Sequence, residues 1–89
     1  MDGVRKIRDP AADDEAIEAA VLRQLLALYP VQLTIKELKR EIAGEENDFA
    51  LVDAVERAVR ELAAAGLVHR NGEVVLPSRA ALRLDELFG

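Results

Sequence analysis

Few side chains in this sequence could act as nucleophiles or as metal ligands. Cysteine is absent and His69 is the single histidine, which argues against a thiolate site or a paired imidazole site. Thr34 and Ser78 are the only hydroxyl residues besides Tyr29, and each precedes a helix-like segment that a hydroxyl can cap. A nucleophile activated by histidine is therefore not expected. We predict no catalytic activity, no bound metal and no cofactor.

The basic residues remain as candidates, because lysine and arginine side chains neutralise phosphate groups. Six of them lie between residues 34 and 73, against nine acidic residues, and the whole chain has a net charge of −5. Asp53 and Glu56 each lie four residues before an arginine, Arg57 and Arg60. This spacing allows each acid to pair with an arginine on the same helix. Such a surface could bind phosphate groups or a basic protein partner.

The elements that must position these charges begin with a basic segment and a long helix. The 89 residues, 51% of them hydrophobic, fit one domain over residues 1–89. Residues 1–9 are expected to form either a frayed or strand-like terminus or a basic arm that reaches a nucleic acid. Asp9-Pro10 opens a helix that runs to about Leu28. This helix has two apolar stripes, of which one faces the core and the other must meet the C-terminal segment or a second subunit.

Two further helices are predicted after a short extended segment at Val31–Leu33. Thr34 and Glu37 have the spacing of a capping box, in which each group satisfies a backbone amide at the start of a helix. Gly44 ends this second helix, because glycine is favoured just beyond a helix C-terminus. The third helix is capped by Asn47 or Asp48 and ends before Gly66 in the same way.

A hairpin and a last helix complete the chain. Asn71-Gly72 is the preferred dipeptide of a two-residue type I′ turn, which would place Arg70 opposite Glu73 and make the two residues a cross-strand pair. Pro77 would end the second strand at a sheet edge, because proline cannot donate to a ladder. Residues 78–89 form the C-terminal helix, with Ser78 as its cap.

The predicted fold class is therefore mainly α with a small antiparallel sheet (α+β), in the order helix, strand, helix, helix, strand, strand, helix. This order over residues 13–77 resembles the winged helix-turn-helix domains of bacterial and archaeal regulators. The most specific parts are Thr34–Gly44, the turn to Asn47, and Leu62–Arg70, in which a helix leads through Gly-Leu-Val to a basic residue and a hairpin. The resemblance implies that the third helix enters the major groove and that the hairpin, or wing, touches the backbone.

The resemblance implies a transcriptional regulator that binds duplex DNA. Carried over by position, the expected DNA contacts are Lys36, Lys39, Arg40, Arg57, Arg60, His69, Arg70 and Asn71. The acidic charge count supports a different hypothesis, a protein-interaction module whose acidic third helix binds a basic partner. Acidic residues at 53 and 56 are central to that alternative.

A homodimer is also expected, because apolar side chains remain on the first and last helices after a core has been assigned. The predicted dimerisation residues are Leu22, Leu26, Tyr29, Leu84, Leu87 and Phe88. No apolar run reaches the length of a membrane span, and the basic N-terminus lacks the apolar segment of a signal peptide. We therefore expect a cytoplasmic protein without membrane contact.

Overall fold

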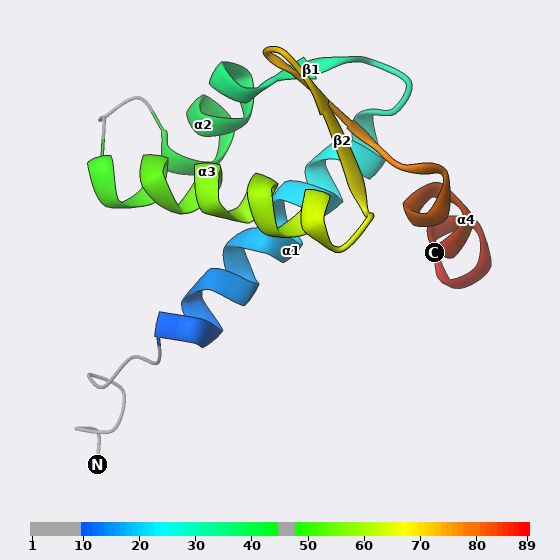
Figure 1. Ribbon diagram of the computed structural model, residues 1–89, viewed down its shortest axis with the longest axis horizontal. Coiled ribbons are helices and arrows are strands. Elements are labelled where there is room, and N and C mark those ends of the chain that lie inside the picture. Colours follow the sequence, from blue (N-terminus) through cyan, green and yellow to red (C-terminus); the bar gives the residue numbers. More distant parts are fainter. Residues whose placement is uncertain (1–9, 45–47) are drawn as a thin grey trace.

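The computed structural model describes residues 10–44 and 48–89, and these form four helices and three short strands (Figure 1). The predicted arm at residues 1–9, the Asp9 cap and Asn47 lie outside the described residues. The chain is mainly helical with a small antiparallel sheet, as the sequence predicted. In chain order the elements are α1 (Pro10–Leu28), β1 (Leu33–Thr34), α2 (Ile35–Ala43), α3 (Phe49–Ala64), β2 (Val68–Asn71), β3 (Val74–Pro77) and α4 (Arg79–Phe88).

The predicted starts of α2, α3 and α4 are confirmed by their caps. The Thr34 hydroxyl accepts the Glu37 amide at 3.1 Å, and the Glu37 carboxylate accepts the Thr34 amide at 2.8 Å, which completes the capping box of α2. Asp48 caps α3 by accepting the amides of Ala50 and Leu51. Ser78 caps α4 through its buried hydroxyl. These local bonds fix where each helix begins, since the first amides of a helix have no partner within it.

The sheet has the strand order β1-β3-β2, with both pairs antiparallel. The predicted hairpin turn is misplaced by one residue, which shifts each cross-strand partner by two residues. Asn71 pairs with Val74 and Arg70 with Val75, so the loop is Gly72-Glu73 and Arg70 does not lie opposite Glu73. Gly72, at φ +63°, still supplies the positive φ of the turn.

Pro77 does not end an edge strand as predicted, because β3 is the central strand. It is tolerated for a geometric reason. Ser78 donates its amide to the Leu67 carbonyl, and hydrogen-bonded pairs alternate along an antiparallel ladder, so the Pro77 nitrogen faces away from β2. On its other side β1 has already ended, since β1 reaches only Val75 and Val74 of β3.

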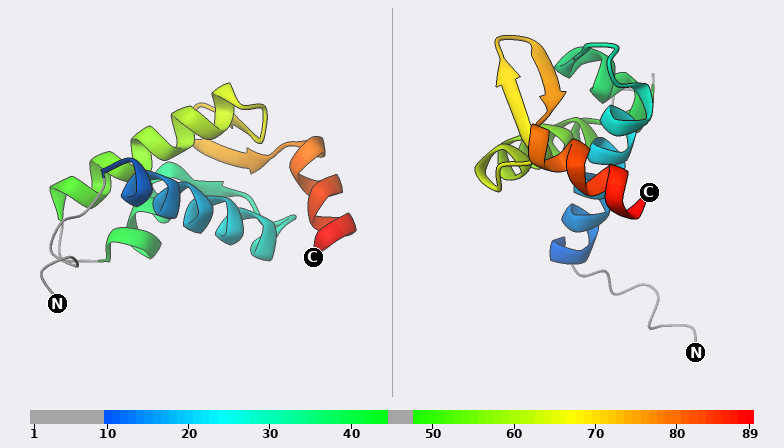
Figure 2. Two further views of the ribbon diagram at one scale, coloured as in Figure 1. Left: turned by 90° about the horizontal axis from the view of Figure 1, so that it is seen from below. Right: turned by 90° about the vertical axis from the view of Figure 1, so that its right-hand side faces the viewer.

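The core lies where α1, α2, α3 and the sheet meet, and α1 packs across α3 at an angle (Figures 1 and 2). Val21 and Leu25 of α1, Leu38 of α2 and Val75 of β3 are almost completely buried. The part of α3 from Ala54 to Leu62 contributes the other large part of the core. In contrast, α4 lies at the end of the molecule where α1 finishes (Figure 2), and among its residues only Ala81 is buried.

Candidate functional site

Three elements meet at the carboxylate of Glu56. Its Oε2 atom lies 2.7 Å from the Lys39 ammonium of α2, and its Oε1 atom accepts a hydrogen bond from Nη1 of Arg70, in β2, at 3.2 Å. Arg70 is held further by a bond from its Nε to the carbonyl of Gly72 at 3.0 Å. We call Lys39, Glu56 and Arg70 the ion cluster. It joins the second helix, the third helix and the hairpin through one side chain.

The ion cluster lies at the surface but is not fully hydrated. The exposed fractions of the Lys39, Glu56 and Arg70 side chains are 27%, 31% and 36%. The pKa of the Glu56 carboxyl is lowered, chiefly by the hydrogen bond from Lys39 and further by Arg70, although partial burial opposes the shift. Glu56 is therefore ionised at neutral pH, and one negative charge is shared by two cations.

The cluster changes the predicted ion pairs of α3. The spacing rule paired Glu56 with Arg60, but Glu56 pairs with Lys39 and Arg70 instead. Arg60 is exposed, and within residues 48–89 and 10–44 no ion pair to Arg60 is found. Arg60 is four positions after Glu56, so it lies beside the cluster. We call the side of α3 that bears Asp53, Glu56 and Arg60 its outer side. Lys36 and Arg40 are also exposed and lie within one helical turn of Lys39.

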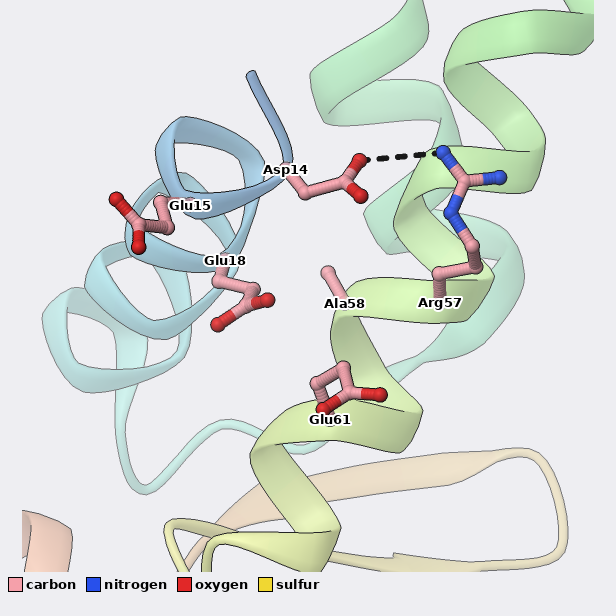
Figure 3. A pocket seen from close by; sticks show the side chains of 6 residues that line it. All are labelled: Asp14, Glu15, Glu18, Arg57, Ala58 and Glu61. Atoms are coloured by element: carbon pink, nitrogen blue, oxygen red, sulfur yellow. Dashed lines mark hydrogen bonds and ion pairs between the residues drawn. The ribbon is translucent and has the colours of Figure 1, made fainter. Parts of the chain in front are cut away.

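Arg57 points elsewhere. Its Nη2 atom lies 3.2 Å from Oδ1 of Asp14, so it joins α3 to α1 rather than pairing with Asp53 as predicted. Figure 3 shows this pair at the mouth of a pocket between the two helices, beside Glu18 and Glu61. The Arg57 guanidinium is therefore held by α1 and is not part of the ion cluster.

Between residues 34 and 73 acidic residues outnumber basic ones. The described acidic residues of this segment are distributed over several surfaces. Glu37 belongs to the capping box and Asp48 caps α3. Glu41 lines a pocket against α1, and Glu61 lines another (Figure 3). Asp53 lies on the outer side of α3, and within the described residues no cation forms an ion pair with it.

The predicted hairpin contacts divide between the two faces of the hairpin. Side chains alternate along a strand, so Arg70 shares a face with buried Val68, while His69 and Asn71 point to the other face. His69 and Asn71 are exposed. The structure thus brings Lys39 and Arg70 together directly, keeps Lys36, Arg40 and Arg60 around them, and places His69 and Asn71 on the opposite side of the ribbon.

Four of the six predicted dimerisation residues line one shallow groove between α1 and α4. Leu22 and Leu26 come from α1, and Leu84 and Phe88 from α4. Tyr29 and Leu87 do not line the groove, but both are exposed at the same end of the molecule. The apolar stripes therefore gather as predicted.

Sequence reasoning missed two partners, Asp14 and Glu56. Asp14 lies 43 residues from Arg57, and no local pattern connects them. Glu56 was predicted to pair with Arg60 or to bind a basic partner, because the spacing rule covers only a single helix. The contact between Glu56 and Arg70 could be predicted only by assuming that the hairpin folds back beside α3.

Among the described residues no group of three potential ligands is placed to hold a metal ion, and no described helix has the length and hydropathy needed to cross a membrane. Comparison with protein-family models, with curated proteins and with solved structures finds no match to this chain. Any function must therefore be argued from the geometry of the chain itself.

Proposed function

We propose that this chain is a winged helix-turn-helix protein that binds duplex DNA through α2, the outer side of α3 and the β2–β3 hairpin, as a transcriptional regulator. The observation that carries the proposal is the ion cluster. It places a lysine of α2 and an arginine of the hairpin on one carboxylate of α3. These are the three elements that such a fold presents to DNA.

The charge around the cluster favours a polyanion. Glu56 neutralises only one of its two cations, and Lys36, Arg40 and Arg60 add three more within about one helical turn. Asp53 is the opposing acid on the outer side of α3. The acids of the pocket between α1 and α3 (Figure 3) face away from this surface. With Glu37 and Glu41 of α2 also counted, this surface has five cations against four acids, whereas residues 34–73 as a whole have six against nine.

In this proposal Glu56 serves as an internal counterion. A carboxylate held by an ammonium and a guanidinium occupies the kind of position that a phosphate oxygen of DNA would take. A backbone phosphate would displace Glu56 from one or both cations. Exposed ion pairs contribute about 0.2–1 kcal/mol, so the exchange is energetically accessible.

The alternative function, an acidic third helix that binds a basic protein, receives less support. It depends on free carboxylates at Asp53 and Glu56, and Glu56 already contacts two cations. A pull-down with the wild type and with Asp53→Asn would reveal a basic partner if one exists. The nucleic-acid proposal is the one that the position of Lys39 and Arg70 favours.

The test is a fluorescence-polarisation titration of a labelled random duplex at low salt. We expect micromolar binding by the full chain that weakens linearly on a logarithmic salt axis, because each phosphate contact releases counterions. Lys36→Ala/Arg40→Ala should weaken it, whereas Arg23→Ala, on α1, should not. Absence of binding at micromolar protein, with no salt dependence, would refute the proposal.

A further inference from the structure

The exposed large apolar side chains are concentrated at one end of the molecule. Of those in the described part of the chain, Phe49 alone lies elsewhere, at the start of α3. The others belong to the end of α1, the segment after it, and α4. They are Leu28, Tyr29, Val31, Leu84, Leu87 and Phe88.

This apolar end is a surface that the elements within residues 10–44 and 48–89 leave uncovered. The helix α4 buries only Ala81, and Phe88 keeps 82% of its surface exposed. Leu84 and Phe88 border the groove whose other wall is Leu22 and Leu26 of α1. Scattered exposed apolar residues are ordinary, but a contiguous set of this kind marks an interaction surface.

The charges of α4 indicate what covers this surface. Arg79, Arg83 and Glu86 follow at spacings of four and three, so they lie along one side of the helix. That side is basic in the first half of α4 and acidic in the second. An antiparallel copy of the same helix would place each basic half beside an acidic half, whereas a parallel copy would oppose like charges.

We propose that the occupant is a second copy of this chain, and that the two copies associate about a twofold axis with their α4 helices antiparallel. Leu84, Leu87 and Phe88 form the apolar centre, and Arg83 of each copy pairs with Glu86 of the other. A twofold interface requires a self-complementary surface, and the charge order of α4 provides it. Within one chain Arg83 already contacts Glu86 at 3.0 Å, with both side chains more than half exposed, so the pair can exchange partners at little cost.

A standard interface takes about 800 Å² from each partner, roughly one-eighth of the 6281 Å² surface of this chain. The ion cluster is not covered by such a contact, since α4 lies at the end of the molecule away from α2 (Figure 1). Two copies would therefore present two ion clusters, although self-association does not depend on DNA binding.

Sedimentation velocity of the full chain over a concentration series tests the proposal. The wild type should reach twice the monomer mass at micromolar concentration. Phe88→Glu should remove the dimer, and the matched control Phe49→Glu, at a phenylalanine that is 79% exposed, should leave it unchanged. A wild-type monomer at every concentration, or equal effects of the two variants, would overturn the proposal. Circular dichroism verifies that both variants keep the helical fold.

A charge exchange tests the antiparallel arrangement itself. Arg83→Glu should weaken the dimer by about tenfold, because it sets two symmetry-related acidic pairs against each other. The double variant Arg83→Glu/Glu86→Arg should restore the wild-type constant, since the order of charges is reversed in both copies. Failure of the double variant to recover, when its helical content is normal, would overturn the antiparallel pairing.

Discussion

The Glu56 carboxylate of α3 lies 2.7 Å from the Lys39 ammonium of α2. This contact decides how the acidic third helix is to be interpreted. Taken alone, Glu56 repels phosphate. Held between Lys39 and Arg70, it marks the place where two cations converge, and its removal should strengthen rather than weaken the binding of a polyanion.

Replacement of Glu56 by glutamine should raise the affinity for duplex DNA by about three- to tenfold, because Lys39 and Arg70 lose their competing anion. The measurement is a polarisation titration at fixed salt. Glu61→Gln is the matched control, since it removes the same charge from the side of α3 that faces α1 (Figure 3). Equal gains in DNA affinity from the two variants would show that only the net charge matters. That result would contradict a specific role of Glu56.

Arg57 and Arg60 should behave differently although they are three residues apart. Arg57 pairs with Asp14 of α1, so Arg57→Ala should change DNA affinity by less than about twofold. Arg60→Ala should weaken binding by several-fold and reduce the salt slope by about one. If Arg57→Ala proved the more damaging substitution in well-folded protein, the assignment of the DNA-binding side of α3 would be wrong.

The ion cluster should also make stability depend on pH. The pKa of Glu56 is lower in the folded state than its ordinary value of 4.5, chiefly because of Lys39. The cluster therefore stabilises the fold fully above that value and loses this contribution as the pH falls through the folded pKa.

Urea unfolding of the wild type and Glu56→Gln measures this dependence. At pH 7 the wild type should be more stable, by no more than about 1 kcal/mol because the groups are partly exposed. The difference should shrink as the pH falls below 4.5 and should disappear once Glu56 is protonated in the folded state as well. A difference that stays constant from pH 7 to pH 3 would show that the lost contact is not ionic.

The capping box should be a local determinant of stability. Thr34→Ala removes the acceptor of the Glu37 amide and should lower the free energy of unfolding by about 1 kcal/mol. The cost extends beyond α2 because Leu38, on that helix, is completely buried. Chemical denaturation is the appropriate measurement, and Lys36→Ala in the same helical turn is the control. A loss below about 0.3 kcal/mol would show that packing, not the cap, fixes this helix.

The sequence predicted the helices well because their signals are local. Thr34 with Glu37, Ser78, and Gly66 at φ +82° all act through atoms within a few residues. The hairpin register was mispredicted for the opposite reason. Asn71-Gly72 favours one turn, but β1 pairs with Val74 and Val75, and the Ile35 amide binds the Glu73 carbonyl. In the structure that forms these long-range bonds, the turn lies at Gly72-Glu73 instead of Asn71-Gly72.

The candidate site was predictable only in part. The cations of α2 and the hairpin could be selected from their types and positions. Which acid would meet them could not, because Glu56 contacts residues 17 and 14 positions away, and the spacing rule offered Arg60 instead. The Asp53–Arg57 pair was mispredicted for a similar reason, since the partner of Arg57 is Asp14 of α1.

A titration of isotopically labelled protein with a short duplex, followed by amide chemical shifts, tests the central claim most directly. The account predicts shift changes that cluster at Lys39, Glu56 and Arg70, extend to Lys36, Arg40 and Arg60, and spare α4. The absence of shifts at millimolar duplex and low salt, or shifts confined to α1 and α4, would contradict it.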